Sequence, residues 1–249
     1  MTQASIALVV PCFDEESRLD RAAFVALLDD MPALGLVFVD DGSRDQTLAI
    51  LHALARERPG RIEVVALTKN QGKAEAVRRG LLHALASPVA IAGFIDADLS
   101  TPPAEILRLT ELARGGLHDV VMGSRVQLLG RSINRKSARH YLGRIFATCA
   151  SLSLGLPVYD TQCGAKLFRR TEALAAALAE PFSSRWAFDV ELLARLIRPR
   201  SGVPAIPVAS IWEEPLLTWT DVPGSKMRLA TALWTGLELV RIGWKLRRR

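Results

Sequence analysis

The sequence predicts an α/β fold in which a mostly parallel central sheet is covered by helices on both faces. Short apolar segments of strand length alternate with longer helical segments through the first 125 residues, as expected of βαβ units. The expected strands are almost continuously apolar, which is typical of strands buried on both faces. Three of them end in acidic residues, and parallel sheets bind ligands at the carboxyl ends of their strands.

The first half of the chain divides clearly into these elements. We expect strands at residues 5–12, 36–39, 62–67, 89–95 and 119–123. We expect helices at residues 18–30, 44–56, 70–86 and 103–114. Pro102 and Pro103 stop the fourth strand, and Pro103 suits the first turn of the helix that follows.

The pattern changes after residue 130. We expect helices at residues 137–154 and 186–196, a turn and strand at 160–170, and a strand at 203–211. Pro204 and Pro207 place that last strand at a sheet edge, because proline cannot donate to the ladder. No linker composition interrupts the chain, so residues 1–225 are expected to form a single domain.

Composition and charge narrow the class of protein. The chain has 249 residues, 49% of them hydrophobic, and a net charge of +6. Residues 226–249 hold seven Lys or Arg and one acid, which accounts for the whole excess. The body is therefore neutral, and we expect no nucleic-acid surface. No apolar run is long enough to span a bilayer, and no signal peptide is expected. The three cysteines have no metal-ligand spacing and form no disulfide framework. Both observations fit a protein in a reducing cytosol.

The basic segment 226–249 has a separate pattern. A narrow polar stripe faces a wide apolar face that includes Trp234 and Trp244, and Arg247 to Arg249 close the segment. This pattern predicts an amphipathic helix that lies on an anionic membrane surface. A helix packed on the domain or on a partner subunit is the alternative.

The acidic pair at the end of the strand 89–95 is the main candidate for chemistry. Asp96 and Asp98 are two residues apart, so on an extended chain both carboxylates point the same way. They repel each other unless a cation lies between them, and Mg²⁺ or Mn²⁺ suits such hard oxygen ligands. Taken alone, the pair also fits a solvated turn or a helix cap.

Two further motifs follow neighbouring strands. Asp41 comes at the end of the second strand, where an acid can bind a ribose hydroxyl or a base N–H. Residues 70–73, Asn-Gln-Gly-Lys, open a helix whose free N–H groups and Lys73 would favour an anion. Turn chemistry, with Ser43 as a helix cap, is the plainer interpretation of the first motif.

Together these motifs resemble family 2 glycosyltransferases of GT-A fold, in the polyprenyl-phosphate branch that includes the dolichyl-phosphate glucosyl- and mannosyltransferases. The matching stretches are residues 10–15, 39–43, 70–73, 96–99, 123–125, 160–168 and 223–226, in family order. The stretches 162–168 and 188–193 are closer to the glucosyl members. Asp14 stands where many members have Asn, and Ser100 stands where mannosyl members often carry a metal-binding Gln.

The resemblance implies a division of labour along the chain. Residues 1–125 would bind the nucleotide sugar, residues 126–225 the acceptor, and residues 226–249 the membrane interface. The implied nucleotide-sugar and cofactor residues are Pro11, Phe13, Glu15, Asp41, Gly72, Lys73, Asp96 and Lys226. Asp96 and Asp98 would hold Mg²⁺ or Mn²⁺. The implied catalytic residues are Asp98, Arg125 and Arg139, the two arginines gripping the lipid phosphate bidentately. Arg139 could instead be a solvated helix residue.

The resemblance further implies an inverting glycosyltransferase. The expected donor is UDP-glucose, and the expected acceptor is a polyprenyl or dolichyl phosphate. Such a phosphate has a second pKa of about 6 and is dianionic at neutral pH, so it needs no general base. We expect a cytoplasmic enzyme that is peripheral on the cytoplasmic face of a membrane; the sequence does not determine its oligomeric state.

Several alternatives remain open from the sequence. The donor could be GDP-mannose or a UDP-N-acetylhexosamine, or the acceptor could be a hydroxyl with Asp189 or Glu191 as general base. A nucleotidyltransferase is disfavoured because no Gly-rich loop follows Val10. A membrane-binding scaffold without activity is disfavoured by the acids at positions 41, 96 and 98.

Overall fold

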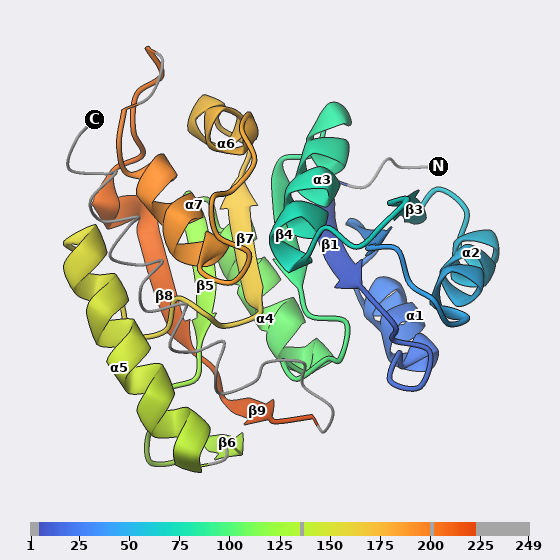
Figure 1. Cartoon of the computed structure of the whole chain (residues 1–249), viewed down its shortest axis with the longest axis horizontal. Coiled ribbons are helices and arrows are strands. Elements are labelled where there is room, and N and C mark those ends of the chain that lie inside the picture. Colours follow the sequence, from blue (N-terminus) through green and yellow to red (C-terminus); the bar gives the residue numbers. More distant parts are fainter. Residues whose placement is uncertain (1–4, 135–136, 200–201, 223–249) are drawn as a thin grey trace.

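A seven-stranded sheet forms the centre of the molecule (Figure 1). The computed structural model describes residues 5–134, 137–199 and 202–222. The strands, in sheet order, are β3 (Ile62–Ala66), β2 (Leu34–Asp40), β1 (Ile6–Cys12), β4 (Ile91–Ile95), β7 (Ala165–Arg169), β5 (Val120–Ser124) and β8 (Ile211–Pro215). β7 runs antiparallel to both of its neighbours, and the other pairs are parallel.

Helices cover both faces, as the sequence predicts. One face packs against α1 (Arg21–Asp30), α2 (Thr47–Glu57) and α4 (Pro103–Arg114). The other packs against α3 (Lys73–Ala86), α5 (Ser137–Leu154), α6 (Glu172–Leu178) and α7 (Phe188–Leu196). Alternation along β1 sends Leu8 and Val10 to the first face and Ala7 and Val9 to the second, as the period of two requires. The prediction of a mostly parallel α/β sheet is confirmed.

The second half of the chain contains the errors of prediction. The strand expected at residues 203–211 is wrong: a 3-10 turn occupies Val208–Ser210, and β8 begins only at Ile211. Pro204 and Pro207 supply no N–H, so the ladder forms after them. The expected edge position is nevertheless correct, since β8 ends the sheet.

Three short elements were not predicted. They are α6 and the parallel strands β6 (Ser132–Asn134) and β9 (Thr218–Thr220), which pair with each other outside the main sheet. Three-residue strands are too short to show a period, and the pairing joins segments far apart in the sequence. Among the described residues, no helix combines the length and the apolar character that crossing a bilayer requires.

The contact between α3 and the sheet gives a test of packing. Gly80 lies in the middle of α3, and a Cβ there would collide with Val9 and approach Val39 Cγ2 at 2.8 Å. Helix propensity alone favours Gly80→Ala by about 1 kcal/mol. Overpacking costs about 1–3 kcal/mol. We therefore expect Gly80→Ala to lower the free energy of unfolding, measured by urea denaturation.

The double variant Val9→Ala/Gly80→Ala is the control, because it removes both Val9 methyl groups that the new methyl group would meet and leaves only Val39 Cγ2 close to it. Adding Gly80→Ala to Val9→Ala should therefore lower the free energy of unfolding by less than adding it to the wild type. A stabilised Gly80→Ala single variant would contradict the close approach of α3 to β1.

Candidate active site

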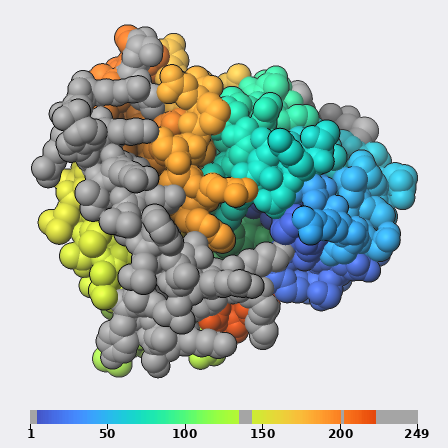
Figure 2. All heavy atoms as spheres, in the orientation of Figure 1, coloured from blue at the N-terminus to red at the C-terminus, as the bar shows by residue number. Residues whose placement is uncertain are grey.

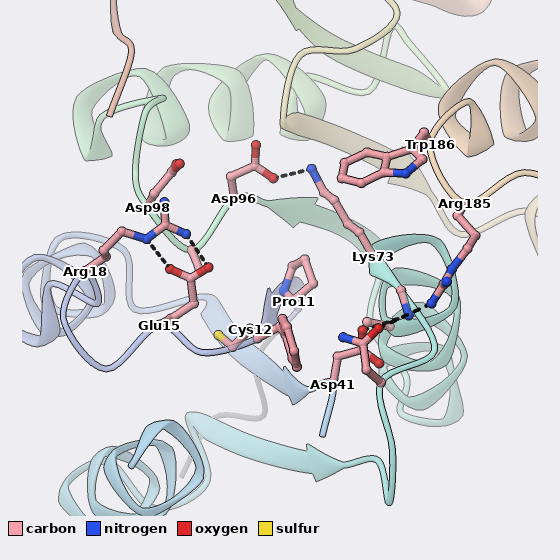
Figure 3. Close-up of a pocket in the computed structure, with 15 residues that line it drawn as sticks. Pro11, Cys12, Glu15, Arg18, Asp41, Lys73, Asp96, Asp98, Arg185 and Trp186 are labelled. Carbon is pink, nitrogen blue, oxygen red and sulfur yellow. Dashed lines mark hydrogen bonds and ion pairs between the residues drawn. The ribbon is translucent and has the colours of Figure 1, made fainter. Parts of the chain in front are cut away.

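A cavity of about 360 Å³ opens at the carboxyl ends of β1, β2 and β4 (Figure 3). These strands are adjacent in the order β2, β1, β4, so the loops that follow them meet at one edge of the sheet. Eight residues that the sequence singles out line the cavity: Pro11, Phe13, Glu15, Asp41, Gly72, Lys73, Asp96 and Asp98. The parallel register therefore brings together motifs that are separated by as many as 87 positions between Pro11 and Asp98.

Asp96 is held from two sides, by α3 and by the residue just before β7. Its carboxylate accepts a hydrogen bond from Lys73 Nζ, the first residue of α3, at 2.5 Å. Its backbone N–H donates to Gly164 O, just before β7, at 2.9 Å. A Cβ at Gly164 would overlap the Asp96 carboxylate, so any other residue there would displace that carboxylate from its present position. Burial alone would lower the pKa of Lys73, but Asp96, Asp189 and Asp98 raise it, which keeps the ammonium charged.

Asp98 lies in a tight turn that follows β4. Its Oδ1 accepts hydrogen bonds from Ser100 N at 3.0 Å and Ser100 Oγ at 2.8 Å. Leu99, between them, has φ of +49°, a left-handed conformation that is unusual for a bulky side chain. Such outliers persist only where the surrounding structure enforces them. The turn therefore fixes the direction of the Asp98 carboxylate.

Asp96 and Asp98 provide a donor set that fits a hard divalent cation. Within the described part of the chain, no three His, Cys, Asp or Glu side chains gather into a metal site. The protein would thus supply two carboxylates, and Mg²⁺ is commonly bound by one or two carboxylates together with substrate phosphates. Ser100 is a hydrogen-bond partner of Asp98.

Asp41 shapes the rim of the cavity. Its carboxylate accepts hydrogen bonds from Gln71 N at 2.7 Å and Gly72 N at 2.8 Å. Burial raises the pKa of Asp41, although those two N–H groups act in the opposite direction. Gly72 has φ of +93°, which favours glycine. The sequence analysis expected N–H groups of residues 70–73 to bind an anion. Two of them, Gln71 N and Gly72 N, donate to Asp41 instead.

The loop after β1 is held in a similar way. Glu15 accepts two hydrogen bonds from the Arg18 guanidinium, from Nε at 2.8 Å and Nη2 at 2.5 Å. Asp14 Oδ1 accepts a hydrogen bond from Arg44 N at 2.8 Å, and Asp14 N donates to Ser43 Oγ. These contacts tie the loop after β1 to the loop after β2, so the cavity has a defined wall on this side.

Four lining residues were missed by the sequence analysis: Arg18 and Ala76 lie near predicted motifs, whereas two others come from a distant loop. Arg185 and Trp186 belong to the loop between α6 and α7, and both line the cavity. In the space-filling view the orange segment before α7 lies directly beside the teal α3 (Figure 2). Reasoning from strand ends could not find them, because they follow a helix. The available signal was an Arg-Trp pair just before an amphipathic helix.

Arg125, predicted to grip a phosphate, lies outside the cavity lining. Its guanidinium forms a bidentate pair with Asp160, with Nε at 2.6 Å and Nη2 at 2.9 Å. Burial opposes the charge, but Asp160 raises the pKa of Arg125 above its ordinary value. Arg139 lies in α5, and its side chain is outside the described residues, as is the whole of Lys226. The roles of these three residues stay predictions.

The two candidate bases are both buried in ion pairs. Asp189 Oδ1 lies 2.7 Å from Lys166 Nζ, and burial raises the pKa of Asp189 against the influence of Lys166 and Lys73. Glu191 pairs with Arg195 at 2.6 Å and accepts a hydrogen bond from Ser183 N at 2.8 Å. Neither is among the described residues that line the cavity.

Comparisons with known proteins identify the family of this chain. Residues 7–174 match the model of glycosyl transferase family 2. The human dolichyl-phosphate beta-glucosyltransferase is 30% identical, over 94% of this chain and 72% of that enzyme. The corresponding enzyme of Drosophila melanogaster is 31% identical, over 95% of this chain and 72% of its own length.

The fold has solved counterparts. A glucosyl-3-phosphoglycerate synthase from Mycobacterium tuberculosis, crystallised with Mn²⁺, UDP-glucose and phosphoglyceric acid, superposes with a TM-score of 0.67 at 20% identity. The match covers 97% of this chain and 79% of the synthase chain. At this identity the likeness concerns the fold alone, which is of GT-A type. The family match and the identity to the curated enzymes together show that this chain is a glycosyltransferase and belongs to family 2, in the branch similar to the dolichyl-phosphate beta-glucosyltransferases.

Proposed function

We propose that this enzyme transfers glucose from UDP-glucose to the phosphate of a polyprenyl lipid such as dolichyl phosphate, with inversion at the sugar carbon. The observation that carries the proposal is the group of Asp41, Lys73, Asp96 and Asp98 around one cavity. It occurs in a chain 30% identical to the human dolichyl-phosphate beta-glucosyltransferase. The proposal is tested by radiolabelled transfer from UDP-glucose, GDP-mannose or UDP-N-acetylglucosamine to a short polyprenyl phosphate.

Each side of the cavity has a proposed role in donor binding. Pro11, Phe13 and Asp41 would enclose the nucleoside, on the side of β1 and β2. Asp96 and Asp98 would hold Mg²⁺ or Mn²⁺, which when bound neutralises charge on the leaving nucleoside diphosphate. The charged Lys73 ammonium, already beside Asp96, would add positive charge at the same place.

A phosphate acceptor needs no general base, which agrees with the pairing of Asp189 and Glu191 with buried cations. A phosphate monoester is dianionic above its second pKa of about 6, so its oxygen can attack without a general base. The pairing of Asp189 with Lys166 and of Glu191 with Arg195 favours structural roles for both acids. We retain Arg125, Arg139 and Lys226 as candidates for binding the acceptor phosphate or the donor.

A membrane-bound acceptor requires that the enzyme reach a lipid surface. We propose that residues 226–249, which carry the whole net charge of +6, hold the enzyme peripherally on the cytoplasmic face of an anionic membrane. Each basic residue near such a surface contributes about 1 kcal/mol. This attraction is sufficient to hold a neutral body without a spanning helix.

Asp98→Asn should lower the rate of glucose transfer by at least about a hundredfold, a typical loss when charge stabilisation is removed from a transition state. The fold should survive, because the amide oxygen can still accept the hydrogen bonds from Ser100 N and Oγ. Transfer rates at several Mn²⁺ concentrations, with thermal melts, provide the measurement. Asp29→Asn on the surface is the control; unchanged metal dependence in Asp98→Asn would refute the assignment.

The acceptor class is tested at the two buried acids. If the acceptor is a phosphate, Asp189→Asn and Glu191→Gln should each lower kcat only slightly. Removing a general base would lower kcat by roughly 10²–10⁴-fold. Asp189→Asn should lower stability by about 3–5 kcal/mol, because Lys166 loses a buried partner. Rates are therefore measured well below the melting temperature. A loss of several orders of magnitude in kcat, with unchanged donor affinity, would indicate a hydroxyl acceptor instead.

Deleting residues 233–249, which keeps Lys226, should release the enzyme from anionic vesicles and leave UDP-glucose binding intact. Binding of the full chain should weaken as salt rises, because the Debye length falls to about 3 Å at 1 M. Part of the vesicle binding should persist at high salt, because Trp234 and Trp244 would be buried in the membrane interface by an apolar interaction that salt does not screen. Vesicle sedimentation at low and high salt measures both effects. A full-length enzyme that never sediments with anionic vesicles would disprove the membrane role.

A further inference from the structure

We propose that Arg185 and Trp186 complete the donor site: Arg185 binds the diphosphate, and Trp186 covers the hexose of the nucleotide sugar. This inference rests on the proposed function, because it assumes a nucleoside-diphosphate sugar in the cavity. Both residues come from the acceptor half of the chain and face the donor motifs of α3 and β4 (Figure 3). They thus close a cavity whose other walls belong to the donor half.

The two side chains project from a braced turn, residues 183–187. Ser184 is 2% exposed, and its Oγ accepts hydrogen bonds from Trp186 N at 3.2 Å and Ala187 N at 2.7 Å. Glu191 accepts a hydrogen bond from Ser183 N at 2.8 Å and is itself fixed by Arg195. The backbone on both sides of Arg185 and Trp186 is therefore held by buried polar contacts. Such support is expected where side-chain positions matter for binding.

Arg185 lies against the turn that precedes α3. Its Nη2 donates to Asn70 Oδ1 at 3.3 Å, and a Cβ on Gly72 would come within 2.7 Å of its Nε. Glycine at position 72 thus leaves room for the guanidinium as well as permitting the positive φ. The nearby acid Asp41 is bonded to backbone N–H groups. A guanidinium has five N–H donors in a planar fork, which suits the oxygens of a diphosphate.

Trp186 lies on the side of the cavity where the sugar is expected. Figure 3 shows its indole ring near the Lys73 and Asp96 side chains, away from the Pro11 and Asp41 side. The diphosphate would lie between the Arg185 guanidinium and a metal at Asp96 and Asp98, and the hexose follows the diphosphate in the donor. An indole ring offers a large, flat apolar surface, and a pyranose has one face of C–H groups that can pack on it.

A ligand series separates the two roles without requiring an acceptor. Calorimetry at constant Mn²⁺ compares UMP, UDP and UDP-glucose. Trp186→Ala should leave UDP affinity unchanged and reduce the ratio of UDP-glucose to UDP affinity by about tenfold, and Trp186→Phe should restore most of that ratio. Arg185→Gln should weaken UDP and UDP-glucose by about tenfold or more and change UMP binding much less.

Matched controls use the same substitutions elsewhere. Trp212→Ala lies in β8, where Trp212 pairs in register with Val121 near the opposite end of the strands, and Arg114→Gln lies at the end of α4. Both should bind the series as the wild type does. An unchanged affinity ratio in Trp186→Ala, or equal weakening of UMP and UDP in Arg185→Gln, would overturn this inference alone. A wild-type enzyme that binds neither UDP nor UDP-glucose would overturn the proposed donor as well.

Discussion

The site depends on how the Asp96 carboxylate is held at the end of β4. Lys73 approaches it from α3, Gly164 packs against it from the start of β7, and Asp98 follows it through a turn. These contacts join an element from the first half of the chain with one from the second. A carboxylate fixed by several partners loses little freedom when a ligand binds, which is the advantage of a preorganised site. The absence of a side chain at Gly164 leaves room for the Asp96 carboxylate at the point where β7 begins.

The same strand extends the charge network into the core. In the register of the sheet Lys166 pairs with Phe94, so its side chain points to the face covered by α7. There its ammonium, 1% exposed as a side chain, meets Asp189. Burying such a pair contributes little net stability, but removing one partner is costly. The charges Lys166, Asp189, Lys73 and Asp96 alternate in sign, so the carboxylate behind the cavity raises the pKa of Lys73.

The acids at the strand ends fall into two groups. Asp14, Glu15 and Asp41 are bonded to backbone N–H groups or to Arg18, and they shape the loops. Asp96 and Asp98 line the cavity, where Asp96 pairs with Lys73 and Asp98 accepts hydrogen bonds from Ser100. Their carboxylate oxygens are ligands that suit a divalent metal ion. All of them look alike in the sequence, as acids that follow apolar strands. Only the hydrogen-bond partners of each side chain separate the acids that build the walls of the cavity, Asp41 included, from the two that can hold a metal ion.

The sequence by itself determined the parallel α/β sheet and the edge at which its motifs meet. Apolar period and length fix the strands of the first half, and acids at three strand ends must converge once those strands are parallel. Tertiary structure decided the rest. β7 inserts antiparallel, Arg125 pairs with Asp160, and Arg185 and Trp186 reach the cavity from a turn after α6. The physical reason is that local periodicity reports which face of an element is buried, whereas these contacts join residues far apart in sequence whose partners only the packed fold selects.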